Sequence, residues 1–348
     1  MSNSIGTVYR FTVWGQSHSP AIGVTVEGIP AGTQIDTALL QEFLDRRKPG
    51  GDPLTTARKE EDEPEFIAGV IRDDAGGSRI LTACGAPVTA VIRNLDARSG
   101  DYEGSRYIPR PGHADLAAMA KYGDARDHAG GGQFSGRMTA PLCIAGGIAL
   151  QLLERLGIVI AARPVRIGGK TEPDRMRQAV EAAKAEGDSV GGIVECVIDG
   201  VPAGVGEPMF DGLENRIAQA VFGIPAVKGI EFGSGFAGAQ LRGSENNDPF
   251  VLLPGQGTDI TARVGTDTNN HGGSLGGLSS GMPIVFRAAF KPTPSIAKEQ
   301  DSVDIRTGEK VRLSLKGRFD PCVALRAVPA VEAAAAAALY DLIRLREA

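Results

Sequence analysis

The sequence predicts a mixed α+β fold built from two related halves. The expected strands and helices do not alternate strictly along the chain, which favours mixed layers over a doubly wound parallel sheet. A seven-residue segment at residues 26–32 (VEGIPAG) is echoed at residues 198–204 (IDGVPAG). Each copy closes an alternating strand and leads into an amphipathic helix. The repeat therefore indicates an internal duplication with pseudo-twofold symmetry, although one short match is also compatible with coincidence.

Hydrophobic periodicity and end signals place the expected helices. The first begins near Asp36, carries Leu40, Phe43 and Leu44 on one face, and stops at the Pro-Gly pair of residues 49–50. The helix after the second copy of the repeat opens at residues 211–214, which resemble a capping box. The other helices are expected at residues 115–121, 142–156 (ended by Gly157), 171–186 (capped by Thr171) and 330–346.

Apolar alternation and short apolar runs place the expected strands. One strand contains Ile22, Val24 and Val26, and the others are expected at residues 88–93, 158–162, 192–198, 284–290 and 311–315. No low-complexity linker interrupts the chain, so residues 1–348 are interpreted as a single domain. Long, polar, glycine-rich loops at residues 49–62, 96–111 and 246–280 are more typical of site-forming loops than of domain joints.

Composition limits the class of protein. The net charge of −5 and the lack of a basic run with interleaved aromatics argue against a nucleic-acid surface. No secretory signal layout begins the chain, and the longest apolar stretch, residues 141–153, is glycine-broken and too short to span a bilayer. The cysteines show no metal-ligand spacing, so no metal site is expected and they are interpreted as small buried hydrophobes in a reducing compartment; they are Cys84, Cys143, Cys196 and Cys322. We therefore expect a cytoplasmic enzyme or binding protein.

Glycine-rich turns flanked by Arg, Lys and Ser indicate where chemistry is expected. Backbone N–H groups in such turns, together with cations, bind phosphate and other anions. No segment reads GxxxxGK[ST], so no P-loop is present. The triple glycine at residues 130–132 does not join a strand to a helix, so it is not a dinucleotide fingerprint either. His18, between Ser17 and Ser19, suits acid–base catalysis but equally suits a polar loop before a strand. Residue chemistry alone therefore predicts a site for a small anionic ligand, with histidine acid–base assistance.

Ten segments, taken in order, resemble the chorismate synthase family nearly from end to end. Any one of them is a weak signal, but ten in order leave little room for chance. They are GxSH at residues 15–18, DRRxPG at 45–50, RPGHAD at 110–115, KYG at 121–123, GGGxxSxR at 130–137, VPAGxGEPxFD at 201–211, AVKGxE at 226–231, NNHGGxLGGxSSG at 269–281, KPTxS at 291–295 and RxDPCxxxRAVPxxE at 318–332.

The resemblance implies an α+β fold with helices sandwiched between antiparallel sheets, usually assembled as a homotetramer. It implies the last step of the shikimate pathway, an anti-1,4-elimination of phosphate from 5-enolpyruvylshikimate-3-phosphate that gives chorismate. The family requires reduced FMN without net redox change. The ring hydrogen that is lost lies next to no carbonyl, so side chains are too weak as bases and the flavin carries the hard step. No insertion is long enough for a nucleotide-binding unit, so an external source of reduced flavin is expected.

The resemblance also implies roles for individual residues. His18 would donate a proton near the departing phosphate, His113 would supply a proton to the reduced flavin, and Asp320 would accept the substrate proton. Asp320 also suits a turn before a proline, and His128 and His271 are expected to be structural. Guanidinium groups that pair with the substrate's anions are implied at Arg47, Arg110 and Arg137, the first also as an NADP contact. Flavin contacts are implied at Gln133, Phe134, Ser135, Ala226, Gly276, Lys291, Pro292, Thr293, Pro294, Ser295 and Arg318.

The glycine-rich segment departs from the family pattern. The usual text is RGGGRxSARET followed by a further arginine, whereas residues 129–139 are AGGGQFSGRMT and Leu142 takes the later position. Each lost charge-assisted hydrogen bond is worth roughly 1.5–3 kcal/mol, so Arg58, Lys59 and Arg126 are candidates to compensate. The alternatives are a flavin-binding paralogue with an altered anionic substrate and a non-catalytic anion-binding protein. The retained His18, His113 and Asp320 favour the enzyme.

Overall fold

The computed structural model describes residues 3–48, 61–72, 79–95, 106–254, 263–315, 317 and 319–347. Its α-helices are α1 Thr37–Asp45, α2 Asp115–Tyr122, α3 Thr139–Glu154, α4 Pro173–Ala185, α5 Leu213–Phe222, α6 Gly235–Gly238, α7 Gly243–Asn246 and α8 Val323–Glu347. Short 3-10 turns are η2 Gly123–Ala125, η3 Gly132–Phe134, η4 Gly136–Met138 and η5 Met209–Asp211.

The strands of the described residues form antiparallel sheets. They are β1 Ser4–Ile5, β2 Phe11–Gly15, β3 Ala21–Val26, β4 Gln34–Asp36, β5 Glu65–Ala68, β6 Val70–Arg72, β7 Ile80–Ala83, β8 Val88–Arg93, β9 Val159–Ile167, β10 Gly192–Asp199, β11 Val227–Phe232, β12 Phe250–Leu252, β13 Val264–Thr266, β14 Ser274–Leu275, β15 Leu278–Ser279, β16 Ile284–Phe290, β17 Gln300–Val303 and β18 Lys310–Leu313. The two largest sheets have the orders β1-β2-β3-β8-β5 and β11-β16-β10-β9.

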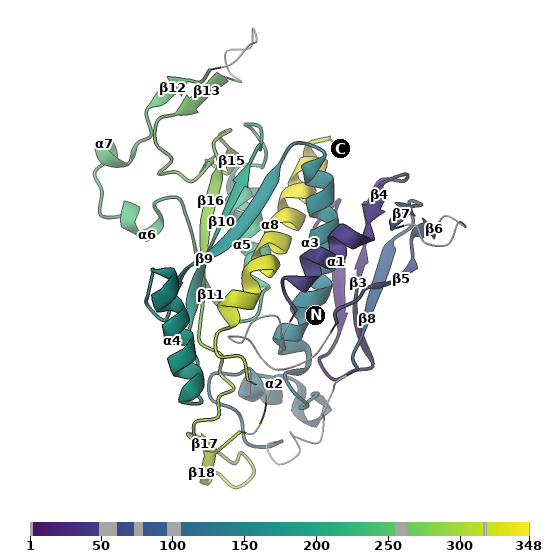
Figure 1. Ribbon diagram of the computed structural model, residues 1–348, viewed down its shortest axis with the longest axis vertical. Helices are drawn as coiled ribbons and strands as arrows, with labels where there is room; N and C mark the ends of the chain where they lie inside the picture. Colours follow the sequence, from purple (N-terminus) through teal and green to yellow (C-terminus); the bar gives the residue numbers. More distant parts are fainter. Residues whose placement is uncertain are drawn as a thin grey trace.

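Helices α3 and α8 lie side by side between these two sheets (Figure 1). Helix α3 packs against β2, β3 and β8, and α8 packs against β9, β10 and β16. A Cβ atom added at Gly146 of α3 would lie 2.2 Å from the Cα of Ala333, so the helices touch backbone to backbone. The buried alanine run at residues 333–338 is the close-packed helix face that such a contact requires. The predicted sandwich of helices between antiparallel sheets is confirmed.

The two halves of the chain repeat one order of elements. β2, β3, α1, β8 and α3 recur as β9, β10, α5, β16 and α8, and β3 and β10 hold equivalent places inside their sheets. The repeated heptamer begins on the last residue of β3 in one half and on the last two residues of β10 in the other. Its glycines adopt the left-handed conformation in both copies, with φ of +78° at Gly28, +84° at Gly32, +86° at Gly200 and +85° at Gly204. This correspondence supports the predicted pseudo-twofold duplication.

Several expected elements agree with the structure and others extend further. β8 and β16 have the predicted bounds, and Ile22, Val24 and Val26 form the buried side of β3. β9 continues five residues beyond its expected end and includes Pro164, because it is an edge strand that tolerates a missing N–H group. Helix α8 begins at Val323, seven residues early, and contains Pro329 in its interior. Burial of its first turns outweighs the hydrogen bond that the proline removes.

Three smaller expectations are wrong. Thr171 does not cap α4, because Pro173 takes the first helical position and leaves Glu172 as an extended N-cap. The capping box at residues 211–214 is absent, since the N-cap of α5 is Gly212 and no side chain bonds to it. Cys84 is exposed, whereas the other cysteines are buried as expected.

The two long apolar helices are core elements of the fold. By length and composition, residues 136–154 and 323–347 are able to cross a membrane, and the first segment is longer than the expected apolar run. Their most apolar windows are 78% and 72% buried inside the molecule. This burial is what the central helices of a packed core require.

Candidate active site

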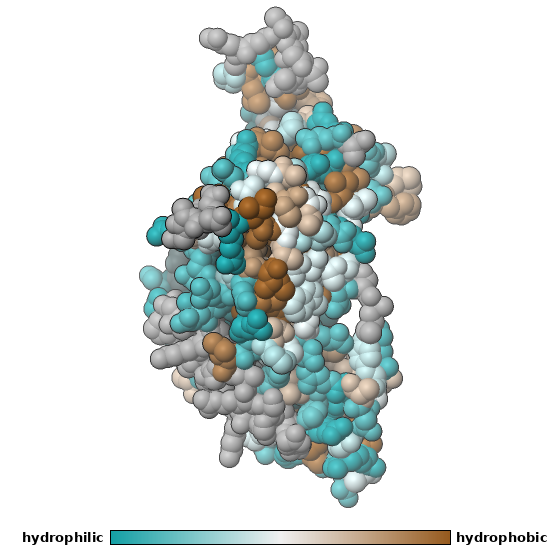
Figure 2. Space-filling view, turned by 90° about the vertical axis from the view of Figure 1, so that its right-hand side faces the viewer, coloured by the Kyte–Doolittle hydropathy of each residue, from teal (hydrophilic) through white to brown (hydrophobic). Residues whose placement is uncertain are grey.

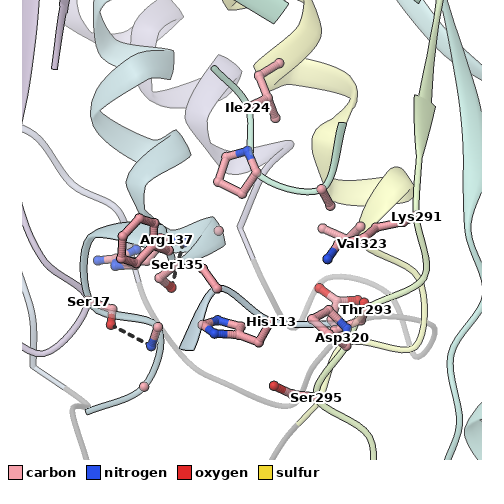
Figure 3. A pocket seen from close by; sticks show the side chains of 18 of the residues that line it. Ser17, His113, Ser135, Arg137, Ile224, Lys291, Thr293, Ser295, Asp320 and Val323 are labelled. Atoms are coloured by element: carbon pink, nitrogen blue, oxygen red, sulfur yellow. Dashed lines mark hydrogen bonds between the residues drawn. The ribbon is translucent and has the colours of Figure 1, made fainter. Parts of the chain in front are cut away.

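A cavity of about 510 Å³ lies below the ends of α3 and α8, where the glycine-rich segment, the turn before α2 and the loop after β16 meet (Figure 3). Most of the predicted site residues line it, although they come from distant parts of the sequence. These residues are His18, Arg110, His113, Gln133, Phe134, Ser135, Arg137, Ala226, Lys291, Thr293, Pro294, Ser295 and Asp320.

Four predicted site residues are not among those that line the cavity. Arg47 is 2% exposed and lies beneath the cavity wall. Gly276 lies in the turn between β14 and β15, and the described part of residues 246–280 contributes nothing to the cavity lining. Pro292 is exposed and faces Gly191. Arg318 lies outside the described residues.

Asp115, in the first turn of α2, organises one wall of the cavity. Its two carboxylate oxygens accept hydrogen bonds from Arg110 at 2.7 and 2.8 Å, and Oδ1 lies 2.7 Å from Nδ1 of His113. Burial alone would raise the pKa of Asp115, but the hydrogen bonds from Arg110 and His113 hold it well below its ordinary value. The ionised carboxylate makes Nδ1 of His113 a donor. The ring atom left to exchange a proton is Nε2.

His18 packs against the triple glycine. A Cβ atom added at Gly130 would lie 2.6 Å from Nε2 of His18 and 2.9 Å from Oγ of Ser17. Gly130 also has φ of +64°, a conformation that side chains disfavour. Arg110 reaches the same segment, because its Nη2 donates to the Gly130 carbonyl at 2.6 Å. Glycine here lets the backbone approach the histidine closely.

The loop after β16 provides a cation and a buried hydroxyl group. The Lys291 ammonium donates to the carbonyl of Gly112, and burial lowers the pKa of Lys291, with a further decrease from the charge of Lys228. The Oγ1 atom of Thr293 is buried and has no hydrogen-bond partner among the described residues. Ala226, whose carbonyl accepts from the Lys291 N–H at 3.0 Å, has φ of +75°. Such strain costs about 1–3 kcal/mol and clusters at ligand sites.

Arg326, in the first turns of α8, is a cavity residue that sequence reasoning missed. Its Nη1 pairs with Oδ2 of Asp320 at 2.9 Å, and its Nε donates to the carbonyl of Arg47 at 3.1 Å. The expected start of the helix at residue 330 left this arginine in an unassigned stretch. Its place six residues after Asp320, within the last family segment, was the available signal.

Asp62 was also missed, and it lies directly beneath the cavity. Its carboxylate bonds to Arg137 through Oδ1 and to Arg47 through Oδ2. Burial would raise the pKa of Asp62, but the two guanidinium groups lower it below the ordinary value. Arg137 also bonds to Oδ1 of Asn94 at 3.2 Å. The sequence carried no periodic or spacing signal for this contact.

The cavity lining has more positive than negative charge. Among the described residues that line it, the cations are Arg110, Arg137, Lys291 and Arg326, and the carboxylate is Asp320. Arg126, a candidate to replace the missing cations, instead donates to the carbonyl of Arg106 and is not among the lining residues. The arrangement can bind an anion with several negative groups and can move protons at two histidines.

Comparisons with known proteins agree with this chemistry. The family profile described as chorismate synthase matches residues 9–343. Similar chorismate synthases include that of Chitinophaga pinensis, 46% identical over 99% of this chain and 97% of the relative. That of Thermococcus kodakarensis is 45% identical over 99% of this chain and 98% of the relative. That of Korarchaeum cryptofilum is 43% identical over 97% of this chain and 96% of the relative.

A solved structure described as a crystal structure of chorismate synthase has the same fold. It matches with a TM-score of 0.72 at 24% identity, over 98% of this chain and 93% of that chain. The similarity in fold and the profile match both extend over nearly the whole chain. Because the relatives are also more than 40% identical over almost their full length, the chain belongs to the chorismate synthase family, whose members are carbon–oxygen lyases of the shikimate pathway.

Proposed function

We propose that the protein forms chorismate from 5-enolpyruvylshikimate-3-phosphate in the cavity described above, with reduced FMN bound beside the substrate. The observation that carries this proposal is the convergence of four cations with His18, His113 and Asp320 on one cavity. Its volume of about 510 Å³ lies within the range of ligand pockets. Guanidinium groups are well suited to a substrate that bears a phosphate and two carboxylates.

The cavity residues fit a phosphorylated flavin. The buried hydroxyl group of Thr293 and the ammonium group of Lys291 lie in one wall and suit a phosphate or a polar ring edge (Figure 3). Phe134 and Pro294 add apolar surface for a planar ring. FMN bound here would supply transient electron donation that helps to expel phosphate. The further contacts proposed from the resemblance are Gln133, Ser135, Ala226 and Ser295, which line the cavity, together with Gly276 and Pro292, which are not among its lining residues, and Arg318, which lies outside the described residues.

The proposed acid–base roles follow from the contacts of each residue. His18 donates a proton to the departing phosphate, since imidazole is the side chain that ordinarily titrates closest to neutral pH. His113 exchanges a proton at Nε2, because Asp115 holds Nδ1. Asp320 accepts the substrate proton, and its bond to Arg326 fixes the orientation of the carboxylate. Arg110, Arg137 and Arg326 bind the substrate's anionic groups.

We also propose that the chain acts as one domain in a cytoplasmic homotetramer. The outer face of the sheet β1-β2-β3-β8-β5 supports self-association, because Ser4, Thr12, Thr25 and Thr89 form a row of uncharged side chains across four strands. A band of hydrophobic residues and residues of intermediate hydropathy runs down the side of the molecule that carries this sheet (Figure 2). Light scattering coupled to gel filtration tests this proposal, and a monomer at micromolar concentration would contradict it.

Reduced flavin, we propose, comes from outside this protein. The sequence has no dinucleotide fingerprint, and Arg47, the residue linked to NADP by resemblance, is buried and paired with Asp62. Under anaerobic conditions, oxidised FMN with NADPH should therefore give negligible chorismate, whereas chemically reduced FMN should give sustained product. NADPH consumption coupled to product, with no other protein present, would contradict this.

The proposed substrate is tested against the paralogue alternative, which the comparisons do not favour. The purified protein is incubated anaerobically with reduced FMN and 5-enolpyruvylshikimate-3-phosphate, and chorismate is followed by its absorbance. Steady formation of chorismate is expected. A protein that binds FMN tightly but forms no chorismate at high enzyme concentration would support the paralogue instead.

A further inference from the structure

We propose that Asp62 is a positioning residue that orients the arginines of the substrate-binding wall. The inference rests on the proposed function, because it assigns Asp62 to the binding of the phosphate-bearing substrate. Asp62 does not line the cavity and belongs to none of the ten segments of family resemblance. Its role is exerted entirely through the side chains that it holds.

The first connection runs from Asp62 to Arg137. The Asp62 side chain is fully buried, and its Oδ1 pairs with Nη1 of Arg137, whose side chain is 4% exposed. The Nε of Arg137 donates to Asn94, so two fixed acceptors hold the guanidinium group from behind while Arg137 lines the cavity. A cation held in this way needs no reorganisation when an anion binds.

The second connection runs through Arg47 to the opposite wall. Oδ2 of Asp62 pairs with Nη2 of Arg47, which is fixed further by Oγ1 of Thr139 at 3.3 Å. The backbone carbonyl of Arg47 accepts the Nε of Arg326, and Arg326 pairs with Asp320. Asp62 therefore holds one lining arginine directly and is linked through Arg47 to a second one, Arg326, from a distant part of the chain.

The backbone at Asp62 makes a clean substitution available. Asp62 has φ of +51°, in the left-handed region, where Asn and Asp are better tolerated than other side chains with a Cβ atom. Asp62→Asn therefore preserves shape and backbone tolerance, removes the negative charge and replaces one of the two acceptor oxygens by an NH2 group that cannot accept from an arginine. Asp341→Asn is the matched control, because Asp341 is 1% exposed, pairs with Arg216 at 2.5 Å and does not line the cavity.

The experiment compares these two variants with the wild type by thermal denaturation, steady-state kinetics with reduced FMN, and calorimetric binding of the substrate. Both variants should lose thermal stability. Only Asp62→Asn should raise KM and the substrate Kd, by about 10- to 100-fold, with less than about a tenfold change in kcat. An unchanged KM and Kd in Asp62→Asn would overturn the inference, as would an equal rise in Asp341→Asn.

A double-mutant cycle tests whether the effect passes through the arginine wall. In an Arg137→Leu background, Asp62→Asn should raise KM by less than about threefold, because the main group that it positions is already gone. If the two substitutions instead raise KM by factors that multiply, their effects are independent and the inference is overturned. Should Asp62→Asn fail to fold, Asp62→Glu decides the question: the displaced carboxylate should raise the Kd at least about threefold, and a wild-type Kd would overturn the role.

The outcomes separate this inference from the proposed function. If the wild type forms chorismate and Asp62→Asn binds the substrate with the wild-type Kd, only the role of Asp62 is overturned. A wild type that binds the substrate but forms no chorismate would contradict the proposed reaction, and the calorimetric Kd values would still decide the role of Asp62. A wild type that does not bind the substrate would overturn both.

Discussion

Nδ1 of His113 lies 2.7 Å from Oδ1 of Asp115, and the same carboxylate is clamped by Arg110. The histidine is therefore fixed in ring orientation and in tautomer, with Nε2 as its exchanging atom. Since Asp115 begins a helix and Arg110 precedes it in a turn, a six-residue segment builds this whole arrangement. It is the most self-contained part of the site.

His113→Ala should lower kcat by about 10²–10⁴-fold, the usual contribution of one positioned acid or base. Asp115→Asn should also lower kcat, but less, because the ring remains and only its orientation is lost. Anaerobic turnover with saturating reduced FMN measures both, and circular dichroism checks the fold. Full activity in His113→Ala would remove this residue from the mechanism.

His18→Ala should lower kcat over the same range, and Gly130→Ala should produce a comparable loss without altering the histidine. The added methyl group would collide with Nε2 of His18 and strain a left-handed glycine. Gly243→Ala is the control, since no atom of the described residues outside its own helix turn lies within 4 Å of its Cβ position and its φ is not positive. Wild-type turnover in Gly130→Ala would show that the position of His18 does not matter.

Arg47→Ala should reduce thermal stability and raise KM more than it lowers kcat. Removing one partner of a buried ion pair destabilises by about 3–5 kcal/mol, and Asp62 would be left with a single arginine. The KM effect follows from the disturbed binding wall, which acts on substrate and transition state alike. Thermal unfolding and steady-state kinetics test this, and a collapse of kcat with an unchanged KM would contradict it.

Affinity for FMN should fall at alkaline pH, and the fall should begin at a lower pH than it would for a lysine of ordinary pKa. Burial lowers the pKa of Lys291, so its charge is lost as pH rises through a value below about 10.4, and anion binding weakens with it. Lys291→Arg keeps the charge throughout this range. Fluorescence titration with oxidised FMN measures the Kd from pH 7 to 10.5. Identical pH dependence in the two proteins would exclude a role for Lys291.

The fold was largely predictable because its core elements have clear periodicity. The strands at residues 88–93 and 284–290 have alternating or continuous apolar residues between turn residues. The heptamer repeat already indicated two related halves. The first residues of the helices and strands were harder to predict. The last helix was expected to begin at residue 330, directly after Pro329, yet α8 continues through this proline because the helix is buried on nearly all sides. Tertiary packing outweighed the local signal there.

The site was predictable where its residues belong to recognisable segments. It was not predictable where residues hold the lining side chains without lining the cavity themselves. His18, His113 and Asp320 meet in one cavity although they are up to about 300 positions apart in the chain. Arg47 belongs to such a segment, but only the structure shows that its guanidinium group is turned toward Asp62. Asp62 itself depends on loop geometry, which carries no periodic signature.

In the proposed reaction, this cavity eliminates phosphate with a flavin that is used but not consumed. The most direct measurement mixes the protein anaerobically with one equivalent of reduced FMN and a large excess of 5-enolpyruvylshikimate-3-phosphate, and records chorismate, phosphate and the flavin spectrum. We predict many chorismate molecules per flavin, an equal yield of phosphate, and flavin that is still reduced when the substrate is exhausted. Flavin oxidised in proportion to product, or phosphate released without chorismate, would contradict the account.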